Sequence, residues 1–502
     1  MASVCCLFLM APLISAGPLA LDEHGSYWII DSDLPGSSLE RSLNYAAIPP
    51  LSSWLQQASL TVLGKSEFAF RFPSALCALV TAFVVYRLGT ELRGPVCGGV
   101  AALMVVWHPE AMDEVRIARC YGLVLLMSSV LLLVTLRWLR SLKSFRLAVL
   151  WALAGTGLLW THYTAALLVI ACGAFIAWTG LTEKGQTRAV AGRLLVGFAL
   201  TVALNLPLIP AVLRLREWGP FLNSTSIGQS PWAVIGPFWW AGLPAGVITC
   251  LISGRRGEVG SSTTRRDWLL MVACSLLPLV ILAVLVSGEM PSLANPRYRV
   301  AYAPAGVCLV ALALSSWRDA RGTILGAVAL IGMSWWCSPL APWQMGRLGH
   351  SSDRDWHLLN QYVADRTENG EPIFVQGGLT ESFLVPMYAD DLLFMEYVAC
   401  RVSRFYVQTK HPRYALPFLW NARPGTTDFF HRLIAGWTDP AATFWVACGT
   451  DTDLNHASLA GIQQIALQAG FAPVDKQEWR TAVLIRYART KQNLIRIERE
   501  AE

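Results

Sequence analysis

Two adjacent carboxylates, Asp22 and Glu23, stand where the first apolar stretch of the chain ends. The segment from Ala2 to Leu21 carries no charged residue, and the run LDEHGSYWII follows at once. Charged groups close to lipid are costly and usually functional. The position therefore favours acid–base chemistry at a membrane face over a simple juxtamembrane charge pair.

A second charged group lies in the run HPEAMDEVRIARCYG, which holds Glu110, Asp113, Glu114, Arg116 and Arg119. Arg116 and Arg119 are three residues apart, so on a helix they share one side. The alternative interpretation is a set of salt-bridged loop residues with no part in chemistry.

Three further residues are chemically notable. Arg297 is a cation in a loop expected on the side of the membrane that carries few positive charges, and a lipid phosphate is a natural partner for it. His162 lies at the tip of an apolar hairpin, where a single histidine is more often structural. Arg71, near the start of an apolar segment, could instead extend its side chain toward the membrane surface.

The composition shows which elements must position these groups. Of the 502 residues, 54% are apolar and 15% are charged, whereas soluble proteins carry about 25% charged residues. The chain is therefore predicted to be a membrane protein, and its net charge of +6 and lack of basic clusters indicate no nucleic-acid partner.

A span needs about 20 apolar residues, and we predict about eleven helical spans. They are 3–21, 73–91, 96–110, 118–136, 147–162, 164–182, 194–213, 231–252, 268–287, 299–316 and 323–341.

Lys and Arg residues concentrate in alternate short loops, which predicts a cytoplasmic N-terminus and a C-terminus outside. The loop from 22 to 72 is too long for a simple connector. Within it, IPPLSSWLQQASLTVLG puts Leu51, Leu55, Ala58 and Val62 on one helical face. This pattern favours a helix lying in the membrane interface over a failed short span.

Residues 342–502 alternate polar helical stretches with short apolar runs such as 372–375, 443–447 and 482–485. This pattern predicts a separate extracytoplasmic α/β domain of about 150 residues. The membrane domain would then cover 1–341. A disulfide between Cys400 and Cys448 is left open, as is cleavage of the N-terminal segment as a signal peptide.

The run from Asp22 through NYAAIPPLSSWLQQASLTVLGKSEFAFRFPSAL resembles the GT-C membrane glycosyltransferases that use polyprenyl-phosphate sugars. Protein O-mannosyltransferases and the lipid A aminoarabinose transferase belong to that group. The resemblance covers about residues 15 to 340 and rests on the order of several elements. These are the acidic pair, Tyr45 with the PPL that opens the interfacial helix, Leu63-Gly64, Arg71, Pro73-Ser74, Arg119, Tyr121, His162-Tyr163, Arg297-Tyr298 and Pro304.

The resemblance implies an inverting glycosyltransferase in the cytoplasmic (inner) membrane of a bacterium, which moves a sugar from a polyprenyl-phosphate donor to a hydroxyl acceptor. Asp22 would be the base, and Glu23 a second candidate or an orienting partner. The donor phosphate would be held by Arg71, Arg116, Arg119, Tyr121, Arg297 and Tyr298. Supporting residues would be Glu114, His162, Tyr163 and Tyr45.

The chain departs from the family at Ile48, where His or Lys often precedes the proline pair and could contact the donor phosphate.

We expect no cofactor and assign no metal, although a divalent ion stays open. Two other functions remain as alternatives, a multi-span secondary transporter and a non-catalytic envelope protein that binds polyprenyl lipid. The acceptor could be a protein, a glycan or a lipid.

Overall fold

The computed structural model of the chain forms two compact units. One comprises Met1–Ala16, Ala47–Gly219 and Asn223–Gly346, and the other comprises Gly17–Ala46, Pro220–Leu222 and Arg347–Glu502. The structure describes residues 17–182, 187–223, 234–236, 238, 262–288, 290–315, 320–336, 351–366, 370–377, 379–408, 410–417, 428–437 and 442–489. Most of the expected spans 3–21 and 231–252 lies outside these residues, as does the C-terminal run from Thr490.

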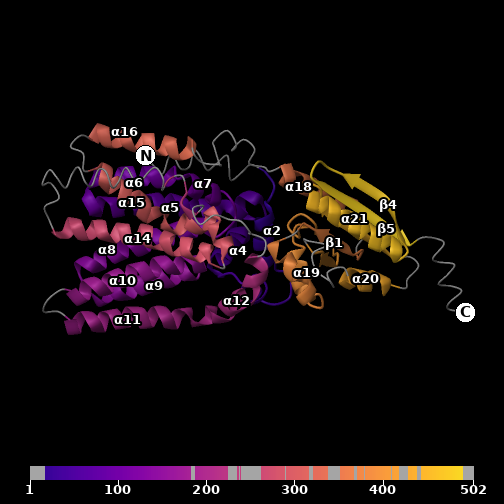
Figure 1. Cartoon of the computed structure of the whole chain (residues 1–502), viewed down its shortest axis with the longest axis horizontal. Helices are drawn as coiled ribbons and strands as arrows, with labels where there is room; N and C mark the ends of the chain where they lie inside the picture. The colour runs from indigo at the N-terminus through magenta and orange to yellow at the C-terminus, as the bar shows by residue number, and fades with distance from the viewer. Residues whose placement is uncertain are drawn as a thin grey trace, which may run out of the picture. The chain divides into compact units, whose positions relative to one another are not determined.

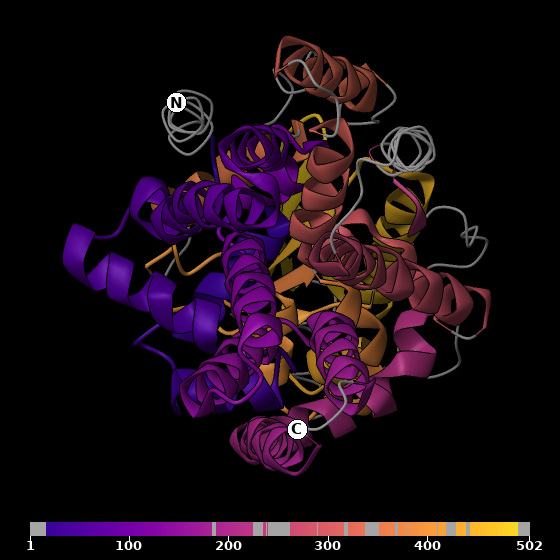
Figure 2. The same cartoon turned by 90° about the vertical axis from the view of Figure 1, so that its left-hand side faces the viewer.

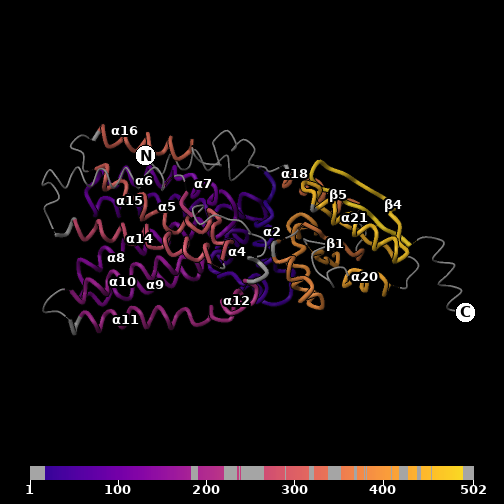
Figure 3. The backbone as a smooth tube through the Cα atoms, viewed as in Figure 1, coloured from indigo at the N-terminus to yellow at the C-terminus, as the bar shows by residue number. Residues whose placement is uncertain are grey.

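The first unit is a bundle of apolar helices, which Figure 1 shows from the side and Figure 2 shows end-on. Its main helices are α4 (Leu51–Leu63), α5 (Glu67–Arg93), α6 (Pro95–Val106), α7 (Pro109–Val115), α8 (Tyr121–Arg140), α9 (Phe145–Leu159), α10 (Ala166–Thr182), α11 (Thr187–Asn205), α12 (Ile209–Asn223), α14 (Ser262–Ser287), α15 (Ala303–Leu314) and α16 (Ala320–Trp336). Short 3-10 turns connect several of them: η1 (Tyr163–Ala165), η2 (Leu206–Leu208), η5 (Pro291–Ala294) and η6 (Pro296–Tyr302). Figure 3 traces α11 through η2 into α12.

Within the described residues, six helical segments are long and apolar enough to cross a membrane. They are Glu67–Arg93, Tyr121–Arg140, Tyr163–Thr182, Val190–Gly219, Arg265–Ser287 and Pro296–Leu314. Two shorter apolar helices, Pro95–Val106 and Phe145–Leu159, correspond to two further expected spans. The prediction of a polytopic helical membrane protein is confirmed.

Helix α4 has its polar side inside and its apolar side outside. It buries Ser52, Gln56 and Ser59, and the Ser59 hydroxyl donates to the Ala69 carbonyl at 2.5 Å. Its other side exposes Leu55 and, most strongly, Val62, which is 81% exposed. The predicted apolar face is confirmed, and it points away from the protein.

The second unit is built on a five-stranded sheet of order β2-β1-β3-β5-β4. Strands β1 (Ile373–Gln376), β2 (Arg413–Ala415) and β3 (Thr443–Gly449) are parallel, whereas β5 (Ala482–Arg489) runs antiparallel to β3 and to β4 (Phe471–Glu478). The helical elements are α2 (Leu21–Ile30), α3 (Ser38–Asn44), α18 (Ser351–Arg366), η7 (Thr380–Met387), α19 (Leu392–Val398), α20 (Asp428–Ala435) and α21 (Asp453–Gln468). The predicted C-terminal sheet domain and its three apolar strands are confirmed, and Cys400 and Cys448 are buried free thiols.

Helix α2 packs inside this second unit because its aromatic residues find partners there. Tyr27 lies against Phe405 with ring centroids 5.0 Å apart, and Trp28 lies 5.1 Å from the Tyr397 ring. Gly25 allows a close approach, since a Cβ atom there would lie 3.3 Å from Leu379. The segment that carries Asp22 is thus held by residues of the sheet domain.

Arg41 fixes the loop after α2 through hydrogen bonds to backbone carbonyls. Its guanidinium donates to the carbonyl oxygens of five residues at distances from 2.7 to 3.1 Å. They are Ile29, Asp31, Leu34, Pro35 and Gly36. The side chain is buried, so these bonds organise the core of the loop.

Candidate active site

The two N-terminal carboxylates have different surroundings in the first turn of α2. Glu23 is fully buried, and its carboxylate accepts a hydrogen bond from the Ala20 backbone N–H at 2.8 Å. Asp22 is half-buried. The helix N-terminus stabilises both negative charges. Glu23 therefore has a structural capping role, and Asp22 is the more accessible carboxylate.

Three loops that are far apart in sequence meet in the first unit. His162, just before η1, lies between Tyr121 at the start of α8 and Tyr298 in η6, with ring centroids 5.5 Å and 5.6 Å away. The Arg297 guanidinium lies 5.3 Å from the centroid of the Tyr298 ring. We call Tyr121, His162, Arg297 and Tyr298 the cation–aromatic cluster. All four residues were predicted from the sequence as site residues.

The hydrogen bonds of His162 define its protonation state. Its Nδ1 accepts from the Thr164 backbone N–H at 3.3 Å and lies 2.8 Å from the Thr164 hydroxyl. Since Nδ1 accepts, the proton of the neutral ring resides on Nε2. Burial, followed by the positive charges of Arg297 and Arg119, lowers the pKa of His162 to about 3. The ring is therefore a neutral hydrogen-bond donor at physiological pH.

The loop between α7 and α8 contributes further charges. Glu114 and Arg119 are half-buried, and both act electrostatically on Cys120, as does Arg297. Arg116 forms an ion pair with Asp113 at 2.5 Å, and its Nε also donates to the Asp113 carbonyl. Arg119 and Glu114 are thus close enough to act on Cys120 and Tyr121, whereas Arg116 is held by Asp113 of α7.

The remaining predicted residues fall in both units. Arg71 is buried in α5, with 4% of its surface exposed, so it does not extend along the outside of the helix. Tyr163 begins η1 beside His162. Tyr45 lies in the second unit with its ring centroid 5.8 Å from that of Trp28.

The most deeply buried ion pair of this region was not predicted. Arg299 in η6 donates from Nη2 to Glu110 Oε1 at 2.5 Å and from Nε to Glu110 Oε2 at 3.1 Å. Each side chain is 4% exposed. The sequence does contain a signal for it, because Arg299 is a charged residue at the edge of an apolar span, and such residues usually have a partner.

Within the described residues, no three His, Cys, Asp or Glu side chains are grouped so that they could hold a metal ion.

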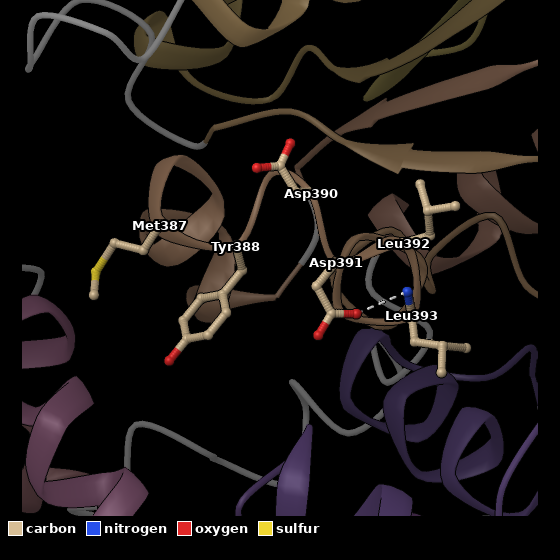
Figure 4. A pocket seen from close by; sticks show the side chains of 6 residues that line it. All are labelled: Met387, Tyr388, Asp390, Asp391, Leu392 and Leu393. Atoms are coloured by element: carbon tan, nitrogen blue, oxygen red, sulfur yellow. Dashed lines mark hydrogen bonds between the residues drawn. The ribbon is translucent and has the colours of Figure 1, made fainter.

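A shallow hollow in the second unit is lined by Met387, Tyr388, Asp390, Asp391, Leu392 and Leu393. Figure 4 shows the Asp391 carboxylate accepting from the Leu393 N–H, so that it caps α19. None of the predicted site residues lines this hollow.

Part of the chain matches a known family model. Residues 47–207 match the family model described as dolichyl-phosphate-mannose-protein mannosyltransferase. The matched range contains Arg71, Arg119, Tyr121 and His162, and it ends before Arg297. No curated protein sequence matches the chain.

Several solved structures match nearly the whole chain. ArnT from Cupriavidus metallidurans, bound to undecaprenyl phosphate, is 13% identical over 97% of each chain with a TM-score of 0.57. The chain has the ArnT fold. The archaeal oligosaccharyltransferase AglB from Archaeoglobus fulgidus, in complex with an inhibitory peptide and a dolichol-phosphate, is 12% identical with a TM-score of 0.53, covering 98% of this chain and 74% of its own. The arabinofuranosyltransferase AftD from Mycobacteria is 15% identical with a TM-score of 0.54, covering 97% of this chain and 39% of its own. The predicted resemblance to GT-C enzymes is confirmed at the level of fold.

Proposed function

We propose that the protein is an integral-membrane glycosyltransferase. It moves a sugar from a polyprenyl-phosphate donor to a hydroxyl acceptor at the outer face of the membrane, with inversion at the anomeric carbon. The observation that carries the proposal is the convergence of Arg119, Arg297 and the aromatic rings around His162 from three separate loops. Cations and neutral donors grouped in this way suit the phosphate of such a donor and of the lipid phosphate that leaves. The ArnT-like fold and the mannosyltransferase family match support the same class of donor.

The chemistry requires few groups. The acceptor oxygen attacks the anomeric carbon and forms a new glycosidic bond, while the bond from that carbon to the phosphate oxygen breaks and polyprenyl phosphate leaves. Phosphate is a good leaving group, so no general acid is needed. Asp22 takes the acceptor proton, which fits a half-buried carboxylate better than the fully buried Glu23.

The cations stabilise the departing phosphate. Arg119 and Arg297 are assigned to its negative charge, and Arg71, Arg116, Tyr121 and Tyr298 support them. His162 contributes a neutral Nε2–H donor, because Thr164 occupies its Nδ1. Together these groups provide fixed donors to a charge that grows in the transition state.

The proposed topology has about eleven spans of about 20 apolar residues each. The N-terminus lies in the cytoplasm, and residues 342–502 lie outside. This arrangement puts the protein in the cytoplasmic membrane with the sheet domain beyond it. The exposed apolar side of α4 suits a helix embedded in the lipid interface.

A secondary transporter is the competing function. Transporters typically show inverted repeats with broken helices near the midplane, whereas the chemically notable groups here lie in the loops before α8, η1 and α15. This placement favours the transferase.

The test is release of lipid phosphate by the purified full-length protein in nanodiscs. Polyprenyl-phosphate mannose is the first probe, followed by other polyprenyl-phosphate hexoses and pentoses. Release of free polyprenyl phosphate that is lost in R119A/R297A supports the proposal. Solute uptake into proteoliposomes with no dependence on a lipid-phosphate sugar would refute it.

A further inference from the structure

The Glu110–Arg299 ion pair joins two of the loops that carry the proposed phosphate-binding cations. Glu110 lies in the first turn of α7, which leads directly to Arg116 and Arg119. Arg299 lies in η6, two residues after Arg297 and next to Tyr298. The two partners are 189 residues apart in sequence. Their bidentate bond therefore holds together α7 and η6, two segments that are distant along the chain.

The surroundings make this bond rigid. Gly236 lies against the pair, and a Cβ atom there would come within 2.0 Å of Glu110 Oε1 and 3.1 Å of Arg299 Nη2. His108, the residue before α7, is 1% exposed and packs its ring 4.7 Å from that of Phe238. The carboxylate and the guanidinium have little space in which to take another arrangement.

Segment η6 is anchored at a second point as well. The Tyr302 hydroxyl donates to the Thr164 carbonyl at 2.8 Å, and Thr164 also holds Nδ1 of His162. One anchor therefore ties η6 to the loop of Arg119, and the other ties it to the loop of His162. Arg297 and Tyr298 directly precede Arg299, the first of these two anchors along the chain.

We propose that Glu110 and Arg299 are positioning residues, which hold Arg297 and Tyr298 in register with Arg119 for binding the lipid phosphate. This inference rests on the proposed function. It assigns a role to a buried pair outside the set of proposed phosphate-binding residues. A buried ion pair is a poor source of net stability, since apolar residues of similar volume often replace it at little cost. A need for fixed geometry explains it better.

The test compares the affinity of full-length variants in nanodiscs for undecaprenyl phosphate, the probe lipid. E110L/R299M removes both charges together, because removing only one would leave a buried unpaired charge. The dissociation constant should rise by about 10- to 100-fold, the effect of losing one charge-assisted hydrogen bond to the phosphate. In the transfer assay, KM for the donor should rise and kcat should fall, because the displaced cations serve both the bound phosphate and the charge that grows in the transition state.

The matched control is E91L/R137M. Glu91 and Arg137 form an ion pair of 2.6 Å in the same helical unit, at the opposite end of α8 from Tyr121. This variant should bind the lipid as tightly as wild type. An affinity of E110L/R299M equal to that of the control would overturn the inference and leave the proposed function intact.

Two further results complete the design. R299K keeps the charge and loses the two-pronged geometry, so its dissociation constant should lie between those of wild type and E110L/R299M. If E110L/R299M fails to fold, an unchanged affinity in R299K overturns the inference. Failure of the wild-type protein itself to bind undecaprenyl phosphate would instead contradict the proposed function.

Discussion

His162 and Tyr298 lie with their ring centroids 5.6 Å apart, although they come from loops that precede different membrane helices. The Tyr121 ring lies 5.5 Å from the same imidazole, and Arg297 lies next to Tyr298. The arrangement combines permanent positive charge with a neutral ring donor. Such a combination fits a phosphate that must be held firmly and then released.

Removing the cations of this cluster should weaken lipid-phosphate binding. A charge-assisted hydrogen bond contributes about 1.5–3 kcal/mol, so R297A should raise the dissociation constant for undecaprenyl phosphate by about 10- to 100-fold. R119A should act in the same direction. Isothermal titration or fluorescence binding in nanodiscs measures both, and R354A, an exposed arginine of the second unit, is the control. Wild-type affinity in R297A would show that this guanidinium does not bind the phosphate.

The stability of the protein should fall in mild acid because of two neutral histidines. The pKa of His162 and that of His108 are both lowered to about 3, chiefly by burial and then by nearby arginines. The unfolded chain titrates near 6.5, so between about pH 6.5 and 3 the unfolded state binds more protons, and stability decreases as the pH falls. Thermal unfolding of wild type and H162N from pH 7.5 to pH 4 checks this. H162N should show the weaker pH dependence, and identical slopes would contradict the account.

Replacing Arg41 should destabilise the second unit. The R41A variant removes the donor from five backbone carbonyls, those of Ile29, Asp31, Leu34, Pro35 and Gly36, which costs about 2 to 4 kcal/mol. Hydrogen exchange of the full-length protein should show faster exchange in α2 and α3. The exposed R354A variant serves again as the control and should change stability by less than about 0.5 kcal/mol. Unchanged exchange in R41A would show that the carbonyl contacts are dispensable.

A single methyl group at Gly236 should reproduce the loss of the Glu110–Arg299 geometry. G236A places a Cβ atom where Glu110 Oε1 lies, so the ion pair must shift. We expect weaker binding of undecaprenyl phosphate, as in E110L/R299M, and the same measurement checks it. G332A, at a glycine whose Cβ position is open, should behave as wild type. A G236A variant with normal affinity would show that the pair can move without consequence.

The sequence predicted most of the fold because hydrophobic periodicity is a local signal. Helices α5, α8, α10 and α14 were expected from their long apolar runs, and β1, β3 and β5 from short apolar runs. Strands β2 and β4 were not expected. They are the two edge strands of the sheet, and β4 is largely exposed. The strand β4 therefore forms through its hydrogen bonds to β5, and its own residues show no buried apolar pattern.

The site was predicted in its residue types but not in its supporting contacts. Arg119, Tyr121, His162 and Arg297 were selected from the family pattern, and the structure adds the geometry among them. Arg299 was missed because it was counted as part of an apolar span, and its partner lies 189 residues away. The packing of α2 in the second unit likewise depends on aromatic partners beyond residue 396, which no local pattern reveals.

The most direct test of the central claim is the transfer rate of D22N with a polyprenyl-phosphate sugar as donor. The account predicts a fall of about 10²- to 10⁴-fold, the usual contribution of a general base, with undecaprenyl phosphate bound as tightly as by wild type. D33N, an exposed aspartate of the same segment, should keep full activity. A D22N enzyme that transfers sugar at the D33N rate would contradict the assignment of Asp22 as the base.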